Sequence, residues 1–221
     1  MAKEIKDVEV IMRILKKKAK NFENPIVTEI GEKTKSPYMV LVSCLLSLRT
    51  MDKITGPISK KLFEIADTPE KIAKMPLKKL QEIIMPVNYY ITKSKRIKDI
   101  SKILIEEYDG KVPDDFDELM KLKGVGRKTA SIVMVYGHRK PYYIPVDSHV
   151  HIIANRIGWV KTKTAEQTMD ELMKKVPKKY WRDLNDVFVM YGQNVCTSLS
   201  PFCSRCVIRK YCPRIGVTKS R

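Results

Sequence analysis

The 221-residue sequence lacks a long hydrophobic run. Its longest apolar stretch, from Tyr38 to Leu48, is too short to cross a bilayer and is interrupted by Ser43 and Ser47. The beginning of the chain is polar and lacks the apolar region of a signal peptide. We therefore expect an intracellular, cytoplasmic protein with no membrane segment.

Acidic residues are few compared with basic ones. The sequence has 43 Lys and Arg against 25 Asp and Glu, which leaves a formal charge of +18 at pH 7. The surplus extends over much of the chain rather than one tail. It favours a polyanionic partner, although a Lys-rich surface can also serve solubility alone.

Low-complexity tracts and fixed-period repeats are also absent. Hydrophobic residues make up 43% of the chain, with ten Tyr, five Phe and two Trp among them. This composition excludes a disordered, collagen-like or disulfide-rich secreted protein. A chain of this length buries a sizeable core without a metal or a disulfide.

Helical periodicity dominates what is present, so the sequence predicts an all-α protein. Ser36-Pro37 and Thr68-Pro69 each place a capping residue before a proline at the first helical position. The apolar run after Pro37 predicts a central, buried helix, and the segment from His138 to Pro145 predicts a crossover between two lobes. Helices are expected over residues 8–15, 37–48, 76–84, 93–108, 114–122 with Asp114 as the cap, 128–136, 148–157, 164–175 and 181–191, the last with a core stripe of Trp181, Leu184, Phe188 and Tyr191.

Four of the five cysteines cluster near the end of the chain. Cys196, Cys203, Cys206 and Cys212 have the spacing C-x6-C-x2-C-x5-C. Disulfides do not suit a chain without secretory features. Zinc usually takes two short knuckles, whereas a [4Fe–4S] cube accepts wider spacing, so spacing alone favours the cluster only somewhat over zinc. Cys44 lies in an apolar segment and is expected to be a buried, inert thiol.

Two glycines, Gly124 and Gly126, separate two helical segments. Glycines at this spacing allow a tight turn with positive φ and leave backbone N–H groups uncovered at the start of the next helix, where a phosphate binds without base readout. An ordinary helix–turn–helix connection has the same pattern. Lys128 follows directly, and at a helix N-terminus in a closed pocket the ammonium form is disfavoured. A neutral amine there attacks a sugar carbon and forms a Schiff base, although Lys128 also suits a simple phosphate contact.

Asp147 lies after the proline-containing loop and before a helix, in the segment Val146-Asp147-Ser148-His149-Val150-His151. Taken alone, it predicts a helix cap. Paired with Lys128, its carboxylate stabilises positive charge at an anomeric carbon or accepts a proton. His149 and His151 point in different directions at a helix start, so we interpret them as structural.

These motifs together resemble the endonuclease III family, the helix–hairpin–helix class of DNA glycosylases with an iron–sulfur cluster. The resemblance runs from about residue 30 to residue 212, and its details look closer to archaeal and eukaryotic members. It rests on the hairpin from Leu122 to Ala130, Val146 to His151, Ala154-Asn155-Arg156, Leu45-Leu46-Ser47 with Asp52, and the four-cysteine pattern.

The resemblance implies a two-lobed, all-α helix–hairpin–helix DNA glycosylase fold with a C-terminal [4Fe–4S] cluster loop. Residues 27–136 would form a six-helix barrel domain, and residues 1–26 with 137–221 would form the cluster domain. It also implies that Lys128 is the nucleophile, that Asp147 assists it, and that Cys196, Cys203, Cys206 and Cys212 hold the cluster. The implied DNA contacts are Arg49, Leu122, Lys123, Gly124, Val125, Gly126, Arg127 and Arg205.

The function implied by the resemblance is a bifunctional DNA glycosylase and AP lyase that excises oxidised pyrimidines. Its partner would be double-stranded DNA with damaged bases or abasic sites, the protein would be a monomer, and a prokaryotic source would place it at the nucleoid. Alternatives are a glycosylase for thymine or uracil opposite G, one for oxidised guanine, and a non-catalytic DNA-binding or redox-sensing protein.

The sequence departs from the family pattern at three positions. Arg49 stands where Gln usually fills the gap left by the flipped nucleotide, and Arg can stack and donate hydrogen bonds to the unpaired base. Lys123 replaces a common Pro of the hairpin. Asn88 replaces a Gly before two aromatics, where Asn tolerates positive φ.

Overall fold

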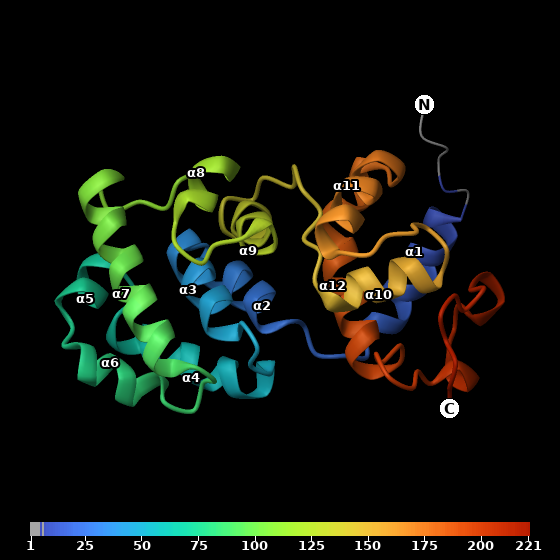
Figure 1. The fold of residues 1–221 in the computed structure, drawn as a ribbon, viewed down its shortest axis with the longest axis horizontal. Helices are drawn as coiled ribbons and strands as arrows, with labels where there is room; N and C mark the ends of the chain where they lie inside the picture. Colours follow the sequence, from blue (N-terminus) through green and yellow to red (C-terminus); the bar gives the residue numbers. More distant parts are fainter. Residues whose placement is uncertain (1–4, 6) are drawn as a thin grey trace. The chain divides into compact units, whose positions relative to one another are not determined.

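The computed structural model describes residue 5 and residues 7–221, and all the regular structure in that part of the chain is helical (Figure 1). The predicted all-α class is confirmed. The α-helices are α1 (Val8–Ala19), α2 (Ile26–Thr34), α3 (Pro37–Ser47), α4 (Asp52–Ile65), α5 (Pro69–Lys74), α6 (Leu77–Ile84), α7 (Tyr90–Glu107), α8 (Phe116–Lys121), α9 (Arg127–Ile132), α10 (Ser148–Arg156), α11 (Ala165–Lys175) and α12 (Trp181–Asn194).

The chain folds into two compact units. Residues 26–140 form one, and residues 141–221 together with the described residues up to 25 form the other. The first unit holds α2 to α9, and the second holds α1 and α10 to α12. The division falls within the irregular segment that follows the last helical turn of the first unit.

Helix α3 is the central helix of the 26–140 unit, as its apolar sequence predicts. Ser36 caps it by accepting a hydrogen bond from the Met39 backbone N–H at 3.2 Å, and Pro37 occupies its first turn. Residues from Tyr38 to Leu46 are almost all buried, and α3 packs against α2, α4, α7 and α9. A helix that is apolar on all sides can be stable only when it is surrounded in this way.

A π-helical turn, η1 (Val133–Gly137), continues α9. Two glycines bring it close to its neighbours. A Cβ added at Gly137 would lie 2.9 Å from Pro37 Cα, and one added at Gly31 would lie 3.0 Å from the Tyr136 carbonyl oxygen. The turn is therefore packed backbone to backbone against α2 and the start of α3.

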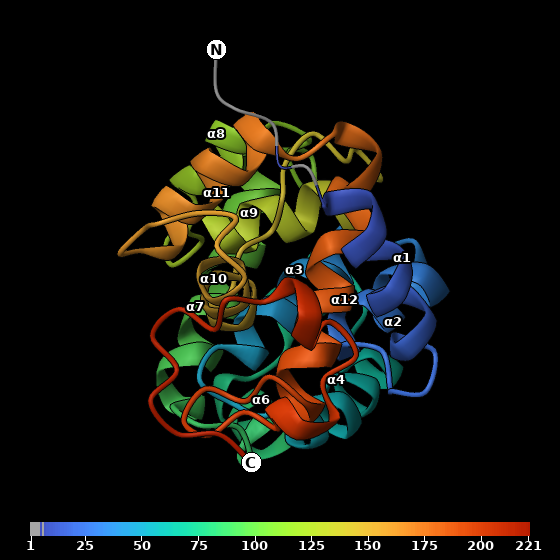
Figure 2. The same ribbon diagram turned by 90° about the vertical axis from the view of Figure 1, so that its right-hand side faces the viewer.

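The core of the second unit forms around α12. The stripe of Trp181, Leu184, Phe188 and Tyr191 is buried, which confirms its assignment as core. Helices α1 and α10 both pack on α12 (Figure 2). None of the helices in the described part of the chain is both long and apolar enough to cross a membrane.

Three local predictions were wrong or incomplete. Helices α2 and α4 were not expected. Helix α4 contains Pro57, and proline is normally disfavoured in the interior of a helix. The cap of α8 is Asp115, whose Oδ1 accepts from the N–H groups of Asp117 and Glu118, and not Asp114. The Asp114 carboxylate instead pairs with Lys140 Nζ at 2.6 Å.

Candidate functional site

The hairpin between α8 and α9 buries its two apolar side chains and exposes both of its glycines. The side chains of Leu122 and Val125 are buried, and the Val125 N–H donates to the Leu122 carbonyl at 2.9 Å. Gly124 has a φ of +87°, and a Cβ there would lie 2.5 Å from Arg96 Nε. The hairpin thus turns where only glycine fits, with a cationic side chain against it.

Gly126 does not have the positive φ that the sequence predicted for the glycines of the hairpin. Its φ is −100° and its ψ is 178°, an extended conformation open to any residue, so positive φ occurs at only one of the two glycines. It is exposed, and an added Cβ would meet nothing within 4 Å. The missing side chain leaves the backbone at the N-terminus of α9 accessible from outside.

Lys128 is the second residue of α9 and is half-buried. Its charge acts on Cys44 of α3: burial raises the pKa of the Cys44 thiol to about 12, the charge of Lys128 opposes this rise, and Asp52 adds to it. Cys44 is 2% exposed, so the predicted burial of its thiol is confirmed. Lys128 and its neighbour Arg127 are both half-buried, whereas Lys123 of the hairpin is exposed.

Asp147 caps α10 in the other unit. Its Oδ1 accepts a hydrogen bond from the Val150 N–H at 2.9 Å, and the residue is half-buried. His151 Nδ1 lies 2.6 Å from Thr168 Oγ1, and His149 packs so closely on Gly192 that a Cβ there would lie 2.4 Å from its Nδ1. Both histidines therefore have structural contacts.

Arg49 is exposed in the turn after α3 and has a left-handed backbone, with a φ of +56°. Its carbonyl oxygen accepts a hydrogen bond from Asn88 Nδ2 at 2.6 Å, and its guanidinium lies 6.0 Å from the centre of the Tyr89 ring. The positive φ expected at Asn88 occurs instead at Tyr89, with a value of 58°. Asn88 thus serves as a hydrogen-bond donor to the turn, and the aromatic residue takes the strained conformation.

Lys93 of α7 was not expected to belong to this region. It is 4% exposed, and its Nζ lies 2.7 Å from the Leu46 carbonyl, 2.5 Å from the Leu48 carbonyl and 3.2 Å from Thr50 Oγ1. Burial, assisted by the nearby charge of Arg96, lowers the pKa of Lys93 to about 8. Nothing in the local sequence signals this role, because a lysine in an amphipathic helix normally faces water.

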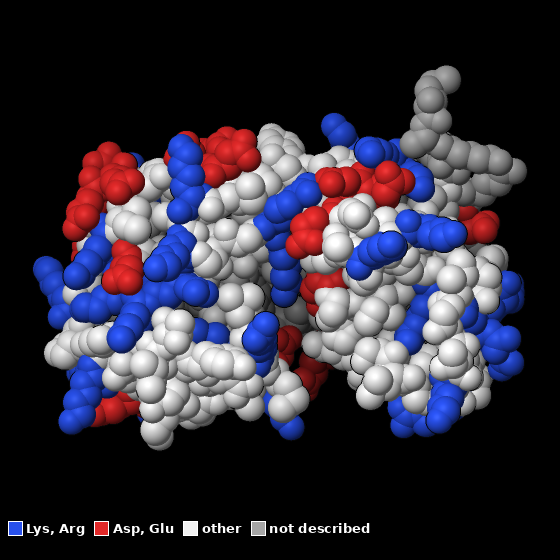
Figure 3. Space-filling model, viewed as in Figure 1, with Lys and Arg blue, Asp and Glu red and all other residues white. Residues whose placement is uncertain are grey.

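Charge is unevenly distributed over the 26–140 unit. In Figure 3, acidic side chains gather over α8 and the C-terminal end of α7, whereas Lys and Arg crowd the surface along the middle of α7 and near α5. The basic side favours a polyanion, and the acidic end disfavours one.

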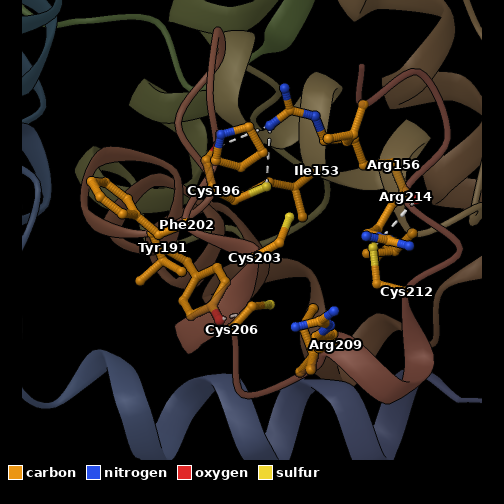
Figure 4. A pocket seen from close by; sticks show the side chains of 15 residues that line it. Ile153, Arg156, Tyr191, Cys196, Phe202, Cys203, Cys206, Arg209, Cys212 and Arg214 are labelled. Carbon is orange, nitrogen blue, oxygen red and sulfur yellow. Dashed lines mark hydrogen bonds between the residues drawn. The ribbon is translucent and has the colours of Figure 1, made fainter. Parts of the chain in front are cut away.

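Cys196, Cys203, Cys206 and Cys212 line one pocket between α10, α12 and the C-terminal segment (Figure 4). Two buried side chains donate to their sulfurs. Arg156 Nη1 lies 3.3 Å from Cys196 Sγ, and the Tyr191 hydroxyl donates to Cys206 Sγ at 3.2 Å. Burial raises the pKa of Cys196, and its hydrogen bond from Arg156 opposes the rise. Sulfurs that already accept hydrogen bonds are suited to carry negative charge as metal-bound thiolates.

The thiols are spread around the pocket. Among the described residues, no three Cys, His, Asp or Glu side chains gather closely enough to bind a single metal ion. A set of four thiolates around a wider space fits a multinuclear cluster better than one closed zinc ion. Arg205 is exposed, but its guanidinium stacks on the Phe202 ring at 3.8 Å and donates to the Asn194 carbonyl.

Comparison with known proteins identifies relatives along most of the chain. Residues 42–178 match the family described as HhH-GPD superfamily base excision DNA repair protein. The chain is 45% identical over 182 residues to "Endonuclease III" of Thermotoga maritima, which covers 82% of this chain and 85% of that protein.

Solved structures give the same result. "Structure of a non-covalent Endonuclease III-DNA Complex" matches with a TM-score of 0.84 and 30% identity, covering 94% of each chain. "Structure of a Trapped Endonuclease III-DNA Covalent Intermediate: Estranged-Adenine Complex" matches with a TM-score of 0.76 and 33% identity, covering 81% of this chain and 84% of that one.

Proposed function

The chain belongs to the HhH-GPD superfamily of base excision DNA repair proteins, and from that premise we propose that it is a bifunctional DNA glycosylase and AP lyase. It acts on double-stranded DNA that contains damaged bases or abasic sites. The observation that carries the proposal is the position of Lys128, half-buried in the first turn of α9 directly after an exposed glycine hairpin. Its substrate, DNA, places the enzyme inside the cell.

The chemistry begins with the target nucleotide outside the base stack, because a duplex hides the sugar carbon. The amine of Lys128 attacks C1′, the C1′–N bond breaks, and the base leaves with the bonding electrons and takes up a proton. The C1′–O4′ bond then breaks and O4′ takes up a proton, which opens the sugar ring and leaves a Schiff base between Lys128 and C1′. The Schiff base acidifies the hydrogen on C2′, and loss of that proton expels the 3′-phosphate by β-elimination. Water then hydrolyses the Schiff base and restores the lysine.

The other site residues have separate roles in this proposal. The carboxylate of Asp147 stabilises the positive charge that develops at the sugar and takes part in proton transfer. Backbone N–H groups of the hairpin hold a phosphate, with Leu122 and Val125 anchoring the turn from inside. Lys123 and Arg127 add charge there, Arg205 contacts a phosphate from the cysteine segment, and Arg49 fills the gap in the stack.

The proposed domains are a helical barrel over residues 27–136 and a cluster domain over residues 1–26 and 137–221. Within the latter, Cys196, Cys203, Cys206 and Cys212 would hold a [4Fe–4S] cluster. The spread of the four thiols and the two donors to their sulfurs support this assignment. The cluster would supply a four-point anchor for a segment with little apolar burial. Brown protein with broad visible absorption is expected, and colourless protein with stoichiometric zinc would contradict the assignment.

The proposal is tested by borohydride trapping on abasic duplex DNA. Reduction of the Schiff base should give a covalent protein–DNA adduct, and Lys128→Ala should abolish it. An unaltered adduct in that variant would exclude Lys128 as the nucleophile, and no adduct in the wild type would favour a protein that binds without cutting.

We propose oxidised pyrimidines as the preferred lesions. A panel of duplexes carrying an oxidised pyrimidine, thymine or uracil opposite G, or oxidised guanine tests this preference under single-turnover conditions. Fastest excision of the oxidised pyrimidine is expected, whereas fastest excision of either other class would reassign the substrate.

A further inference from the structure

The turn after α3 is held by the side chain of one buried lysine, Lys93. Lys93 Nζ reaches two backbone carbonyls and a hydroxyl, at Leu46, Leu48 and Thr50. These acceptors lie on both sides of Arg49 in sequence. A protonated amine has three N–H donors. The turn offers three acceptors, so each donor of Lys93 has a partner there.

The same turn contains a strained residue. A left-handed backbone at a residue other than glycine is strained and persists only where the surroundings hold it. At Arg49 the preceding carbonyl is bound by Lys93, and its own carbonyl is bound by Asn88. With both peptide groups fixed, the Arg49 side chain extends from a rigid base beside the Tyr89 ring.

Lys98, one turn and a half further along α7, offers a direct comparison. Its Nζ also reaches three acceptors, in this case all backbone carbonyls, those of Ile72, Ala73 and Met75 at the end of α5. The two lysines therefore make the same type of helix-end contact from the same helix. Only the Lys93 contact holds a turn that contains a residue with a proposed role in DNA binding, Arg49.

We propose that Lys93 is a positioning residue for base removal, which fixes the Leu48–Thr50 turn so that Arg49 enters the base stack as the target nucleotide leaves it. The inference rests on the proposed function. It predicts a split between substrates: excision from a duplex needs the gap to be filled, whereas Schiff-base formation on single-stranded abasic DNA has no stack to fill.

The test uses the full-length, cluster-loaded protein and the variants K93M, R49A, K93M/R49A and K98M. K93M should slow single-turnover base excision from duplex DNA by roughly 10- to 100-fold, the scale of a misplaced contact group. Its borohydride trapping on single-stranded abasic DNA should stay within about twofold of wild type, as expected for a change outside the chemical step. A 2-aminopurine base beside the lesion should show a smaller fluorescence rise on binding. K98M, the matched control, should behave as wild type in all three assays.

The double variant decides whether Lys93 acts through Arg49. K93M/R49A should excise no more slowly than R49A, because the turn has nothing left to position. Multiplied losses would overturn the inference, as would an equal loss on single-stranded abasic DNA or an equal loss in K98M.

Two milder variants apply if K93M does not fold. K93R keeps a buried donor and should restore most duplex excision, and N88A, at an exposed residue, should lower it in the same selective manner. Failure of both to do so would reject the positioning role. If wild-type protein forms no trapped adduct at all, the proposed function fails instead, so the two failures are distinguishable.

Discussion

The 26–140 unit and the segment of residues 196–221 are held together by different means. The unit surrounds α3 with helices and buries nearly all of that helix. In the segment, only Pro201 and Ile208 are buried, and its regular structure is limited to two single turns, η3 (Cys203–Arg205) and η4 (Arg209–Tyr211). Polar and cationic contacts replace the core: Arg156 donates to the carbonyls of Thr197 and Ser198.

The proposed catalytic lysine thus lies in a unit with a packed core, whereas the segment that carries the four cysteines has almost no core of its own. In the 26–140 unit, packed side chains hold the half-buried Lys128 in a defined place, and no bound group is needed for this. A segment with so little burial cannot offset its conformational entropy by apolar contacts. We therefore expect the proposed cluster to matter for the folding of the segment, and the 26–140 unit to keep its fold without it.

The largest expected effect comes from the packed unit. Lys128→Ala should reduce AP lyase and trapping activity by roughly 10³-fold or more, because the proposed nucleophile is lost. The melting temperature should change little, since the residue is only half-buried. Trapping assays and calorimetry check this, and a large loss of stability would show that Lys128 holds the fold rather than the chemistry.

Asp147→Asn, in the other unit, tests whether Asp147 has a catalytic role or only caps α10. Asparagine is also a good N-cap, so α10 should stay intact while base removal slows by roughly 10²- to 10⁴-fold, as for loss of a general acid–base group. Single-turnover excision and DNA affinity measure the two effects separately. Activity near wild type would reject the catalytic role and leave Asp147 as a helix cap.

Loss of one cysteine should break the segment and spare the unit. Cys212→Ser should remove the brown colour and destabilise residues 196–221 by on the order of several kcal/mol, because cluster binding is coupled to folding. Hydrogen exchange should rise in the segment and stay low in α3. Cys44→Ala, which removes a cysteine from the packed unit, is the control and should keep the colour. Unchanged exchange in the segment of Cys212→Ser would contradict the comparison.

A smaller effect is expected from the titration of Lys93. Its pKa is about 8 in the folded protein against 10.5 when exposed, so between these values the unfolded chain binds more protons. The free energy of unfolding should therefore rise with pH from 8 to 10.5, by roughly 3 kcal/mol, and should show no contribution from this group below pH 8. The pH dependence of K93M, measured by urea unfolding, should lack this rise. Parallel curves for the two proteins would disprove the shift.

The smallest effect is expected at the sulfur of Cys206. Tyr191→Phe removes the hydroxyl that donates to Cys206 Sγ and should lower the midpoint potential of the proposed cluster, because hydrogen bonds to sulfur favour the reduced state. Voltammetry measures this shift. Tyr38→Phe removes another buried hydroxyl, which bonds to Ser101 Oγ at 2.6 Å, and should leave the potential unchanged. An unchanged potential in Tyr191→Phe would exclude the contact as a tuning element.

Local signals in the sequence were sufficient for much of the fold. Ser36-Pro37 and Thr68-Pro69 begin α3 and α5 because capping and a preset φ act within one turn. Pro57 concealed α4, whose tertiary packing outweighs the local preference. Two adjacent aspartates could both cap α8, and only the folded loop decides for Asp115.

The site was predictable where its residues adjoin a recognisable turn. The hairpin, Lys128, Asp147 and the four cysteines could be identified as candidates from spacing. Lys93 could not, because its acceptors lie more than forty residues away in sequence and carbonyl groups belong to every residue. The positive φ at Tyr89 was also missed, since aromatic residues rarely adopt it.

The π-helical turn from Val133 to Gly137 has a consequence for how this sequence tolerates insertions and deletions. A π-turn accommodates one residue more than an α-helical turn, so a one-residue deletion there is absorbed by a return to regular α-helical winding, whereas a further insertion would rotate the preceding helix by about 100° relative to the following chain. Lys128 lies on that preceding helix, and the tight fit of Gly137 against Pro37 leaves no room for compensation. Insertions within these five residues should therefore be purged in any lineage that keeps the lysine in use, while the irregular segment that follows Gly137 is freer to vary.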